Sequence, residues 1–304
     1  MKIWVTGASG SLGEELVARL VKKFPEGELL LPSRDSLDLL NHAEVENFVK
    51  DNKPTHVYHL AALVYGISGH LEFPEKCLLS NTVLDHSVFS ALFKFPPKWI
   101  YYASTVATYG YPFVTLPLSE IDWLRGVPHI SEYGYAMAKR HAKSYLDILH
   151  KEFGVDFVYG LTTNLFGPSD RFQSGRGHVV ISLLKKGLIA RQNSTTLDVW
   201  GNQSTSRDFL STKDAAVLLV ELFNKHTDAI NIASGQEILI SELAEEITRI
   251  LQLKHGYRFT GENEGIPKRV CSIEKLSTYT MGIKEVDSKS LLQRTIANFG
   301  NGAQ

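Results

Sequence analysis

A tyrosine and a lysine four residues apart are the side chains of this sequence best suited to acid–base chemistry. Tyr135 and Lys139 lie in "YGYAMAKRHAKSYLDIL", whose apolar residues have helical spacing, so the two share one face of the expected helix. A free phenol titrates near pH ~10, and a neighbouring ammonium stabilises the phenolate. The pair therefore predicts a tyrosine that exchanges a proton with an alcohol or sugar oxygen near neutral pH.

Hydroxyl groups at the end of an expected strand offer a second contact to such an oxygen. The strand in "YYASTVATYG" ends with Ser104 and Thr105, and either hydroxyl can polarise the oxygen that Tyr135 protonates. A Tyr-x-x-x-Lys pair by itself is more often a chance pair on a helix surface. The prediction therefore depends on the elements around these residues.

Three glycines between a strand and a helix predict a dinucleotide site at the start of the chain. "MKIWVTGASGSLGEEL" places Gly7, Gly10 and Gly13 after an apolar run and before a helical pattern. Such a turn lets a pyrophosphate approach the backbone and directs the helix N-terminus at its charge. The alternative is a tight turn that needs glycine only for its backbone angles.

The residues after the second expected strand bear on the choice of nicotinamide cofactor. An acidic residue usually ends this strand and holds the adenosine ribose, whereas "LLLPSRDS" offers Ser33 and Arg34. A hydroxyl and a cation suit a 2′-phosphate, which favours NADP(H). NAD(H) stays possible because Asp35 can take the ribose hydroxyls, in which case Arg34 is a solvated loop charge.

Apolar runs alternate with helical patterns over the first half of the chain. Runs at 2–5, 28–31, 55–60, 99–102 and 156–161 predict buried parallel strands, and 10–24, 43–52, 80–95 and 135–153 predict helices. This α/β alternation predicts a Rossmann-type doubly wound sheet. We expect a dinucleotide-binding domain over 1–162 with a returning segment near 208–232. We expect a smaller substrate-binding region over 163–207 and 233–304.

Composition excludes several other classes of function. The 304 residues carry 32 Lys plus Arg against 33 Asp plus Glu, without a basic run, so we expect no nucleic-acid partner. Two cysteines, Cys77 and Cys271, cannot build a disulfide framework or a zinc site, and we predict no metal. No apolar stretch is long enough to span a bilayer, and Lys2 leads into a strand without a signal-peptide pattern. We therefore expect a cytoplasmic protein.

The combined motifs resemble the extended short-chain dehydrogenase/reductase family, and within it the nucleotide-sugar branch that contains GDP-L-fucose synthase. The resemblance covers nearly the whole chain through "YGYAMAK", "TTNLFGPSD", "GHVVISLLKK", "VWGNQSTSRDFLSTKDAA" and "GIPKRVCSIEKL". It implies Thr105, Tyr135 and Lys139 as catalytic residues and a homodimer. Around a nucleotide sugar it implies Asn164, Lys186, Trp200, Arg207 and Lys268, with Arg207 on the diphosphate. For Asn164 and Trp200 the alternative roles are loop capping and packing.

The candidate cofactor-binding set follows from the glycine turn, the ends of the expected strands and the tyrosine helix. Asp38 and Leu39 are expected near the adenine, and "HLAAL" ends a central strand where the cofactor crosses. The set comprises Gly7, Ser9, Gly10, Ser11, Leu12, Gly13, Arg34, Asp38, Leu39, Leu60, Ala61, Ala62, Tyr135, Lys139, Thr162 and Leu165.

The sequence departs from the family pattern in "STVATYG". Family dehydratases resemble S-T-D-E-V-Y-G here, and fucose synthases place a cysteine nearby as an epimerisation base. This chain has Val106 and Ala107. An alignment anchored on Tyr-Gly puts Thr105 in the catalytic place and Ala107 in the place of the cysteine; anchoring on the strand gives Ser104 and Val106. Neither supplies a group that removes a proton from carbon, which argues against dehydratase activity and puts epimerase activity in doubt.

His178 matches the histidine that works with that cysteine in fucose synthases. It is a candidate proton donor or sugar ligand, and the alternative is a histidine at a helix start without a chemical task. The main hypothesis is an NAD(P)-dependent oxidoreductase that acts at C-4 of a nucleotide-linked, GDP-linked sugar, as a 4-keto reductase or a 4-dehydrogenase. The alternatives are a bifunctional epimerase/reductase, a nucleotide-sugar 4-epimerase and a cofactor-binding regulatory protein.

Overall fold

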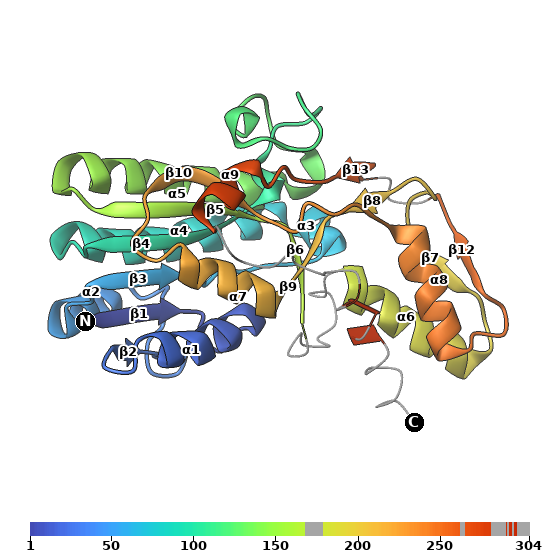
Figure 1. Cartoon of the computed structure of the whole chain (residues 1–304), viewed down its shortest axis with the longest axis horizontal. Coiled ribbons are helices and arrows are strands. Elements are labelled where there is room, and N and C mark those ends of the chain that lie inside the picture. Colours follow the sequence, from blue (N-terminus) through green and yellow to red (C-terminus); the bar gives the residue numbers. More distant parts are fainter. Residues whose placement is uncertain (168–178, 262–264, 281–289, 291, 294, 297–304) are drawn as a thin grey trace.

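The centre of the protein is a six-stranded parallel sheet with the order β10-β5-β4-β3-β1-β2 (Figure 1). The computed structural model describes residues 1–167, 179–261, 265–280, 290, 292–293 and 295–296. The strands are β1 (Lys2–Thr6), β2 (Glu28–Leu30), β3 (His56–His59), β4 (Trp99–Thr105), β5 (Asp156–Thr162) and β10 (Thr227–Ile232). The chain winds outward from β1 in both directions, which confirms the predicted Rossmann-type, doubly wound α/β fold.

Helices cover both faces of this sheet, which explains why its strands are apolar without alternation. On one face α1 (Ser11–Lys23) packs beside α7 (Thr212–Glu221), over a core that includes Ile3 and Val5 (Figure 1). Trp4 points to the other face, which is covered by α2 (His42–Asn52), α4 (Pro74–Lys94) and α5 (Tyr133–Phe153). Because both faces are buried, every residue of a central strand contributes to a core.

The helix boundaries follow local capping signals. Asn41 caps α2 by accepting the backbone N–H of Glu44 at 3.3 Å, and α5 ends at Gly154 with a φ of 69°. The pattern over 80–95 captures only the later part of α4, which begins at Pro74. Proline suits the first turn of a helix, so the helix starts before the apolar spacing becomes regular.

The remaining elements form small sheets and a third core beside the carboxyl edge of the main sheet (Figure 1). β6 (Asn164–Phe166) pairs with β9 (Phe209–Ser211), and β7 (Leu197–Val199) with β12 (Tyr257–Phe259). β8 (Ser206–Arg207) lies between β11 (Ile238–Leu239) and β13 (Lys268–Arg269). The helices of this part are α6 (Val179–Asn193) and α8 (Ile240–Leu251), while α3 (Ile67–Glu72) precedes α4, and α9 (Glu274–Tyr279) packs on β10. The division into two regions at the predicted boundaries stays a prediction.

None of the helices in the described part of the chain is both long and apolar enough to cross a bilayer.

The close contact between β1 and α1 fixes the geometry of the turn that joins them. Gly7 has a φ of 71°, and a Cβ on Gly13 would overlap the carbonyl oxygen of Gly7. The helix therefore starts against the strand end, and only glycine at position 13 allows this approach.

Replacing Gly13 by alanine tests this close approach. We expect Gly13→Ala to lower the free energy of unfolding by about 1–3 kcal/mol, because the added methyl group meets backbone that cannot move aside cheaply. Urea unfolding measures the effect. The matched control is Gly265→Ala, where an added Cβ meets open space. Equal stability of the two variants would show that the turn tolerates a side chain at position 13.

Candidate active site

The glycine turn has the features that a pyrophosphate site requires. Gly10 precedes α1, no side chain caps the helix, and the N–H of Gly10 donates to the carbonyl of Gly7 at 3.0 Å. The Ser11 hydroxyl is buried and finds no hydrogen-bond partner among the described residues. An uncapped helix N-terminus and an unsatisfied hydroxyl both fit phosphate oxygens. The structure thus brings the predicted residues Ser9, Gly10, Ser11, Leu12 and Gly13 into one turn at the end of β1.

The loop after β2 presents an unpaired cation. Arg34 is exposed and makes no hydrogen bond or ion pair within the described part of the chain. Ser33 starts a turn in which its carbonyl accepts the N–H of Ser36 at 3.1 Å. Asp38 is exposed, and its carboxylate accepts the N–H of Leu40 at 3.0 Å, while Leu39 packs against the core. The contacts predicted for these side chains stay predictions.

A buried asparagine shapes the segment that follows β3. Asn81 on α4 accepts the N–H of Leu63 at 2.8 Å and donates to the carbonyl of the same residue at 3.0 Å. Leu60, Ala61 and Ala62 are held between this clamp and the glycine turn, and the N–H of Ala61 donates to Thr6 Oγ1 at 3.1 Å. No motif of the sequence indicates Asn81, because a single asparagine in a helical pattern carries no local signal.

Helix α5 places Tyr135 and Lys139 against the sheet rather than on the surface. A Cβ on Gly134 would overlap the carbonyl oxygen of Pro74, so α4 and α5 pack closely at this point. Tyr135 is 8% exposed and Lys139 is fully buried, with its Nζ 4.5 Å from the ring centroid of Tyr102 and 5.9 Å from that of Tyr135. The shared helix face predicted for Tyr135 and Lys139 therefore turns inward, toward the ends of β3 and β4.

The pKa of Tyr135 differs from the sequence expectation of a phenol that titrates near neutral pH. Burial raises this pKa above the ordinary value, and the negative charge of Asp85 raises it further. Burial also lowers the pKa of Lys139, opposed by the charge of Asp85. In the protein alone, desolvation outweighs the attraction between an ammonium and a phenolate. Tyr135 is therefore a protonated donor at neutral pH.

The structure separates the two candidate hydroxyls at the end of β4. Ser104 is 4% exposed and lies beside the Tyr159 hydroxyl, whereas Thr105 is only half-buried at the strand end. Thr105 Oγ1 accepts the N–H of Ala107 at 3.2 Å, which begins the 3₁₀ turn Val106–Thr108. This bond occupies a lone pair and leaves the hydroxyl proton to donate. The geometry favours Thr105 over Ser104 as the group that faces a reacting oxygen.

A thiol and an imidazole lie beside Tyr135, at a position that the sequence motifs did not predict. Cys77 on α4 packs in one cluster with Ala107 and Tyr135. Its Sγ is 3.4 Å from Nδ1 of His70, whose ring stacks on Tyr135 at a centroid distance of 5.2 Å. Cys77 is fully buried, and burial raises its thiol pKa, so the sulfur stays protonated.

A buried group of charges faces this site from the small sheet. Arg207 and Arg269 are paired neighbours in β8 and β13, and Arg269 forms an ion pair with Glu132. Burial, followed by the nearby Arg269 charge, lowers the pKa of Arg207 to about 10. One carboxylate therefore faces two guanidinium groups, and this excess positive charge suits an anionic ligand. Arg269 lies in the motif "GIPKRVCSIEKL", from which only Lys268 was predicted, and its partner Glu132 is 137 residues away in the chain, so no local pattern indicated the pair.

The other predicted substrate residues are only partly brought together. Lys186 lies over the Trp200 ring at 4.1 Å, and Asn164 donates to the carbonyl of Asp208 at 3.0 Å. Lys268 instead forms an ion pair with Glu237, and its strand position puts it on the opposite face from Arg207. Thr162 and Leu165 sit at the end of β5 and in β6, and His178 lies outside the described residues.

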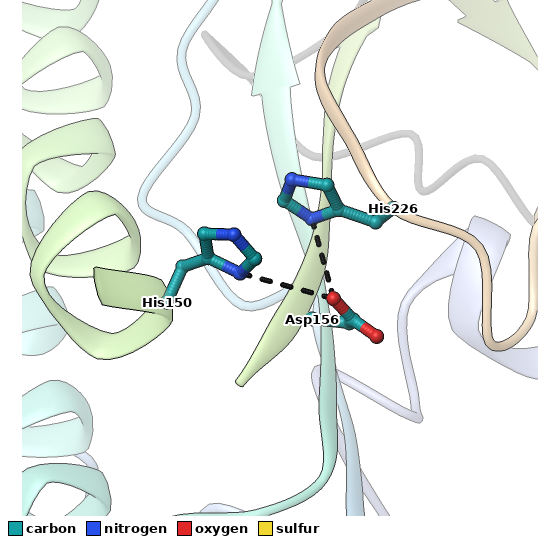
Figure 2. A group of neighbouring side chains, drawn as sticks. All are labelled: His150, Asp156 and His226. Atoms are coloured by element: carbon teal, nitrogen blue, oxygen red, sulfur yellow. Dashed lines mark ion pairs between the residues drawn. The ribbon is translucent and has the colours of Figure 1, made fainter. Parts of the chain in front are cut away.

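A cluster of His150, Asp156 and His226 lies at the other end of β5, away from this site (Figure 2). The two imidazole rings are stacked 4.2 Å apart at 10°, and each Nδ1 is 3.8 Å from Asp156. Near-parallel stacked rings cannot both direct an in-plane lone pair at one ion. The Nδ1 atoms also bond to the backbone, at the carbonyl of Val155 and the N–H of Phe157. We assign no metal to it.

A glycine turn on a parallel sheet, with an inward-facing tyrosine and lysine beside it, defines a nicotinamide-dependent oxidoreductase of the short-chain type. The family model "NAD dependent epimerase/dehydratase family" matches residues 3–233. The chain belongs to this family, as its motifs predicted, and is an NAD(P)-dependent enzyme.

Individual relatives narrow the comparison. The chain is 30% identical over 279 residues to "GDP-L-fucose synthase" of Sinorhizobium fredii, covering 90% of this chain and 88% of the relative. It resembles in fold a GDP-6-OMe-4-keto-L-xylo-heptose reductase from C. jejuni, with a TM-score of 0.85, 20% identity, and coverage of 100% and 98%. It also resembles a GDP-L-fucose synthetase from Naegleria fowleri bound to NADP, with a TM-score of 0.86, 24% identity, and coverage of 99% and 94%.

The unpaired Arg34 generates a prediction about cofactor choice. Arg34→Ala should weaken NADPH binding by roughly 1.5–3 kcal/mol and NADH binding far less, because a charge-assisted contact to the 2′-phosphate is lost. Fluorescence titration of both cofactors measures the difference. Asp35→Asn is the matched control, since it alters the neighbouring charge and leaves the guanidinium in place. Equal losses for both cofactors in Arg34→Ala would make Arg34 a bystander.

Proposed function

We propose that the protein is an NADP(H)-dependent oxidoreductase acting at C-4 of a GDP-linked sugar. It reduces a 4-keto group or, in reverse, oxidises the 4-hydroxyl. The observation that carries this proposal is the place of Ala107, which bonds the half-buried Thr105 through its N–H and packs in one cluster with the buried, protonated Tyr135, and which offers neither an acid nor a thiol. Such a site can protonate an oxygen, and position 107 supplies no group that removes a proton from carbon.

The chain's own residues perform the proton transfer in this scheme. The Thr105 hydroxyl donates to the 4-keto oxygen and polarises the carbonyl. The nicotinamide, when bound, supplies the hydride to C-4. Tyr135 then gives its proton to the oxygen that becomes negative, so that ketone, hydride and proton yield the alcohol. The Lys139 ammonium, on the same helix face, stabilises the phenolate that remains.

The nucleotide end of the substrate is assigned from the charges of the site. Two guanidinium groups, Arg207 and Arg269, face one carboxylate, so a diphosphate restores the balance of charge. The exposed Trp200 ring, with Lys186 over it, offers a stacking surface. Asn164, Lys268 and His178 are proposed as further ligands on the strength of the family motifs. This supports the GDP-linked substrates named for the relatives.

A bifunctional epimerase/reductase is the second candidate, and one observation favours it. Cys77 and His70 lie next to Tyr135, where a proton could leave the sugar ring. Against it, Cys77 is fully buried within the cluster that contains Ala107 and Tyr135, and its thiol stays protonated. The base must lie within about 3 Å of the sugar carbon that loses the proton. A fully buried thiol cannot come this close to the sugar.

A homodimer is proposed on the family resemblance, and a cytoplasmic location on the sequence pattern. Exposed apolar side chains on α4, among them Leu79 and Val83, are consistent with a partner on that face. Sedimentation velocity of the purified chain decides between monomer and dimer, and a monomer at micromolar concentration would remove this part of the proposal.

Tyr135→Phe tests the catalytic assignment. We expect turnover with a GDP-linked 4-keto sugar to fall by about 10²–10⁴-fold, because only the exchangeable proton is removed. Cofactor affinity should stay close to that of the natural protein. Oxidation of NADPH followed by absorbance gives the rate, and Tyr133→Phe on the same helix is the matched control. Near-normal activity of Tyr135→Phe would take this residue out of the mechanism.

Isotope exchange separates the reductase from the epimerase/reductase. With oxidised cofactor in heavy water, a 4-keto substrate should take up no deuterium at C-3 or C-5, yet accept hydride once NADPH is added. Ala107→Cys should introduce some exchange, because it places a thiol where fucose synthases carry theirs. Cys77→Ser should leave the result unchanged. Deuterium in the natural protein that disappears in Cys77→Ser would establish the epimerase/reductase instead.

A further inference from the structure

Four buried side chains and one backbone N–H form a single hydrogen-bonded chain beneath the site, which no motif of the sequence indicated. Asp85 on α4 accepts the Tyr102 hydroxyl at 2.7 Å, and its second oxygen lies 3.0 Å from Nε2 of His59. Nδ1 of His59 lies 2.7 Å from Thr6 Oγ1, which accepts the N–H of Ala61. The side chains of Thr6, His59, Asp85 and Tyr102 are at most 2% exposed.

The hydrogen-bond directions in this chain are fixed by elimination. A carboxylate only accepts, so His59 must donate from Nε2, and burial lowers its pKa, which keeps the ring neutral. Its Nδ1 is then an acceptor and takes the Thr6 hydroxyl proton, while Thr6 Oγ1 accepts from Ala61. Every donor points toward Asp85, which is therefore the terminal acceptor of the network.

The same carboxylate acts on the two groups proposed to carry the chemistry. The Lys139 ammonium lies over the ring of Tyr102, and the hydroxyl of that ring bonds Asp85. The charge of Asp85 raises the pKa of Lys139 and also that of Tyr135. A fully buried ammonium needs a compensating charge close by, and Asp85 is the carboxylate that supplies it in the described part of the chain.

We propose that Asp85 is a positioning residue of this enzyme: its carboxylate holds the buried Lys139 as an ammonium and, through His59 and Thr6, ties it to the glycine turn. This proposal rests on the proposed function in one respect, which is that Lys139 has a catalytic task. The link to the turn is short, because Thr6 immediately precedes Gly7 and the N–H of Ala61 that bonds Thr6 belongs to the residue packed against Gly7. The glycine turn and the pair formed by Tyr135 and Lys139 are therefore supported by the same hydrogen-bonded network around Asp85.

Titration of Lys139 tests the proposal without any substrate. NMR of ¹³C-lysine protein, with Lys139→Met to assign the signal, follows the ammonium against pH in the folded chain. Asp85→Asn should move the titration of Lys139 down by about one pH unit or more, because an opposite charge nearby is lost. Asp122→Asn is the matched control, a buried carboxylate that bonds Thr115 and Arg125 away from the site. An unchanged titration of Lys139 in Asp85→Asn would overturn the proposal.

A double-mutant cycle keeps the test decisive if Asp85→Asn folds poorly. Asp85→Asn removes the opposite charge that acts on the buried ammonium, and Lys139→Met removes the ammonium that acts on the buried carboxylate, so each alone should lower the urea midpoint. The double variant should unfold at a higher urea concentration than Asp85→Asn alone, since neither charge remains. Additive losses in the double variant would also overturn the proposal.

The pH profile of the reduction then gives the functional readout. Removing the Asp85 charge lowers the pKa of both Lys139 and Tyr135. Because loss of either proton stops the reduction, the alkaline limb of the pH–rate profile should move to lower pH in Asp85→Asn. The titratable groups that face Asp85 are His59 on β3, Tyr102 on β4, Tyr135, Lys139 and Tyr145 on α5, and Tyr159 on β5. Tyr102→Phe keeps the charge and should leave the limb in place. A limb that moves equally in both variants would contradict the positioning role.

Failure of the proposed function and failure of the positioning role of Asp85 give different results. If the natural protein reduces no GDP-linked 4-keto sugar while the Lys139 titration still depends on Asp85, the proposed function is wrong and the effect of Asp85 on Lys139 stands. If reduction proceeds and neither the titration nor the alkaline limb responds to Asp85→Asn, the proposed function stands and the positioning role is wrong.

Discussion

The burial of one ammonium group, that of Lys139, is the constraint on which the site depends. An isolated charge in a protein interior is costly, and it persists only where aromatic faces and an opposite charge surround it. Tyr102 from β4 lies against this ammonium, and Asp85 from α4 accepts the Tyr102 hydroxyl, so α4, α5 and β4 must keep a fixed spacing. The close contact at Gly134, where α5 lies against the backbone of Pro74, sets that spacing.

The same packing explains why Tyr135 is a proton donor in the protein alone. Burial raises the pKa of its hydroxyl, and the carboxylate that stabilises Lys139 opposes the phenolate at the same time. A protonated phenol suits the reduction of a ketone, in which the enzyme must deliver a proton to oxygen. The Thr105 hydroxyl completes the site, because its accepting lone pair is used by the 3₁₀ turn and its proton is left to donate.

Charge is distributed unevenly between the two ends of the site. Near Tyr135 one ammonium, Lys139, and one carboxylate, Asp85, are buried, whereas at the small sheet two guanidinium groups face a single carboxylate. A ligand that carries phosphates therefore gains most at that end, while the sugar end is left to hydroxyl groups and to the apolar cluster around Ala107. In the proposed complex, an anionic sugar nucleotide lies with its phosphates toward Arg207 and its ring toward Tyr135.

Local patterns in the sequence were sufficient for the fold class, the glycine turn and the Tyr135–Lys139 pair. Strand runs, glycine spacing and helical spacing are properties of short segments, and the family motifs extended them over the chain. The sequence could not place Asp85, His59, Cys77, Arg269 or Glu132, because each acts through a partner far away in the chain. Their roles depend on helix packing and strand order, and so does the pKa of Tyr135, since burial is decided only when the tertiary structure forms.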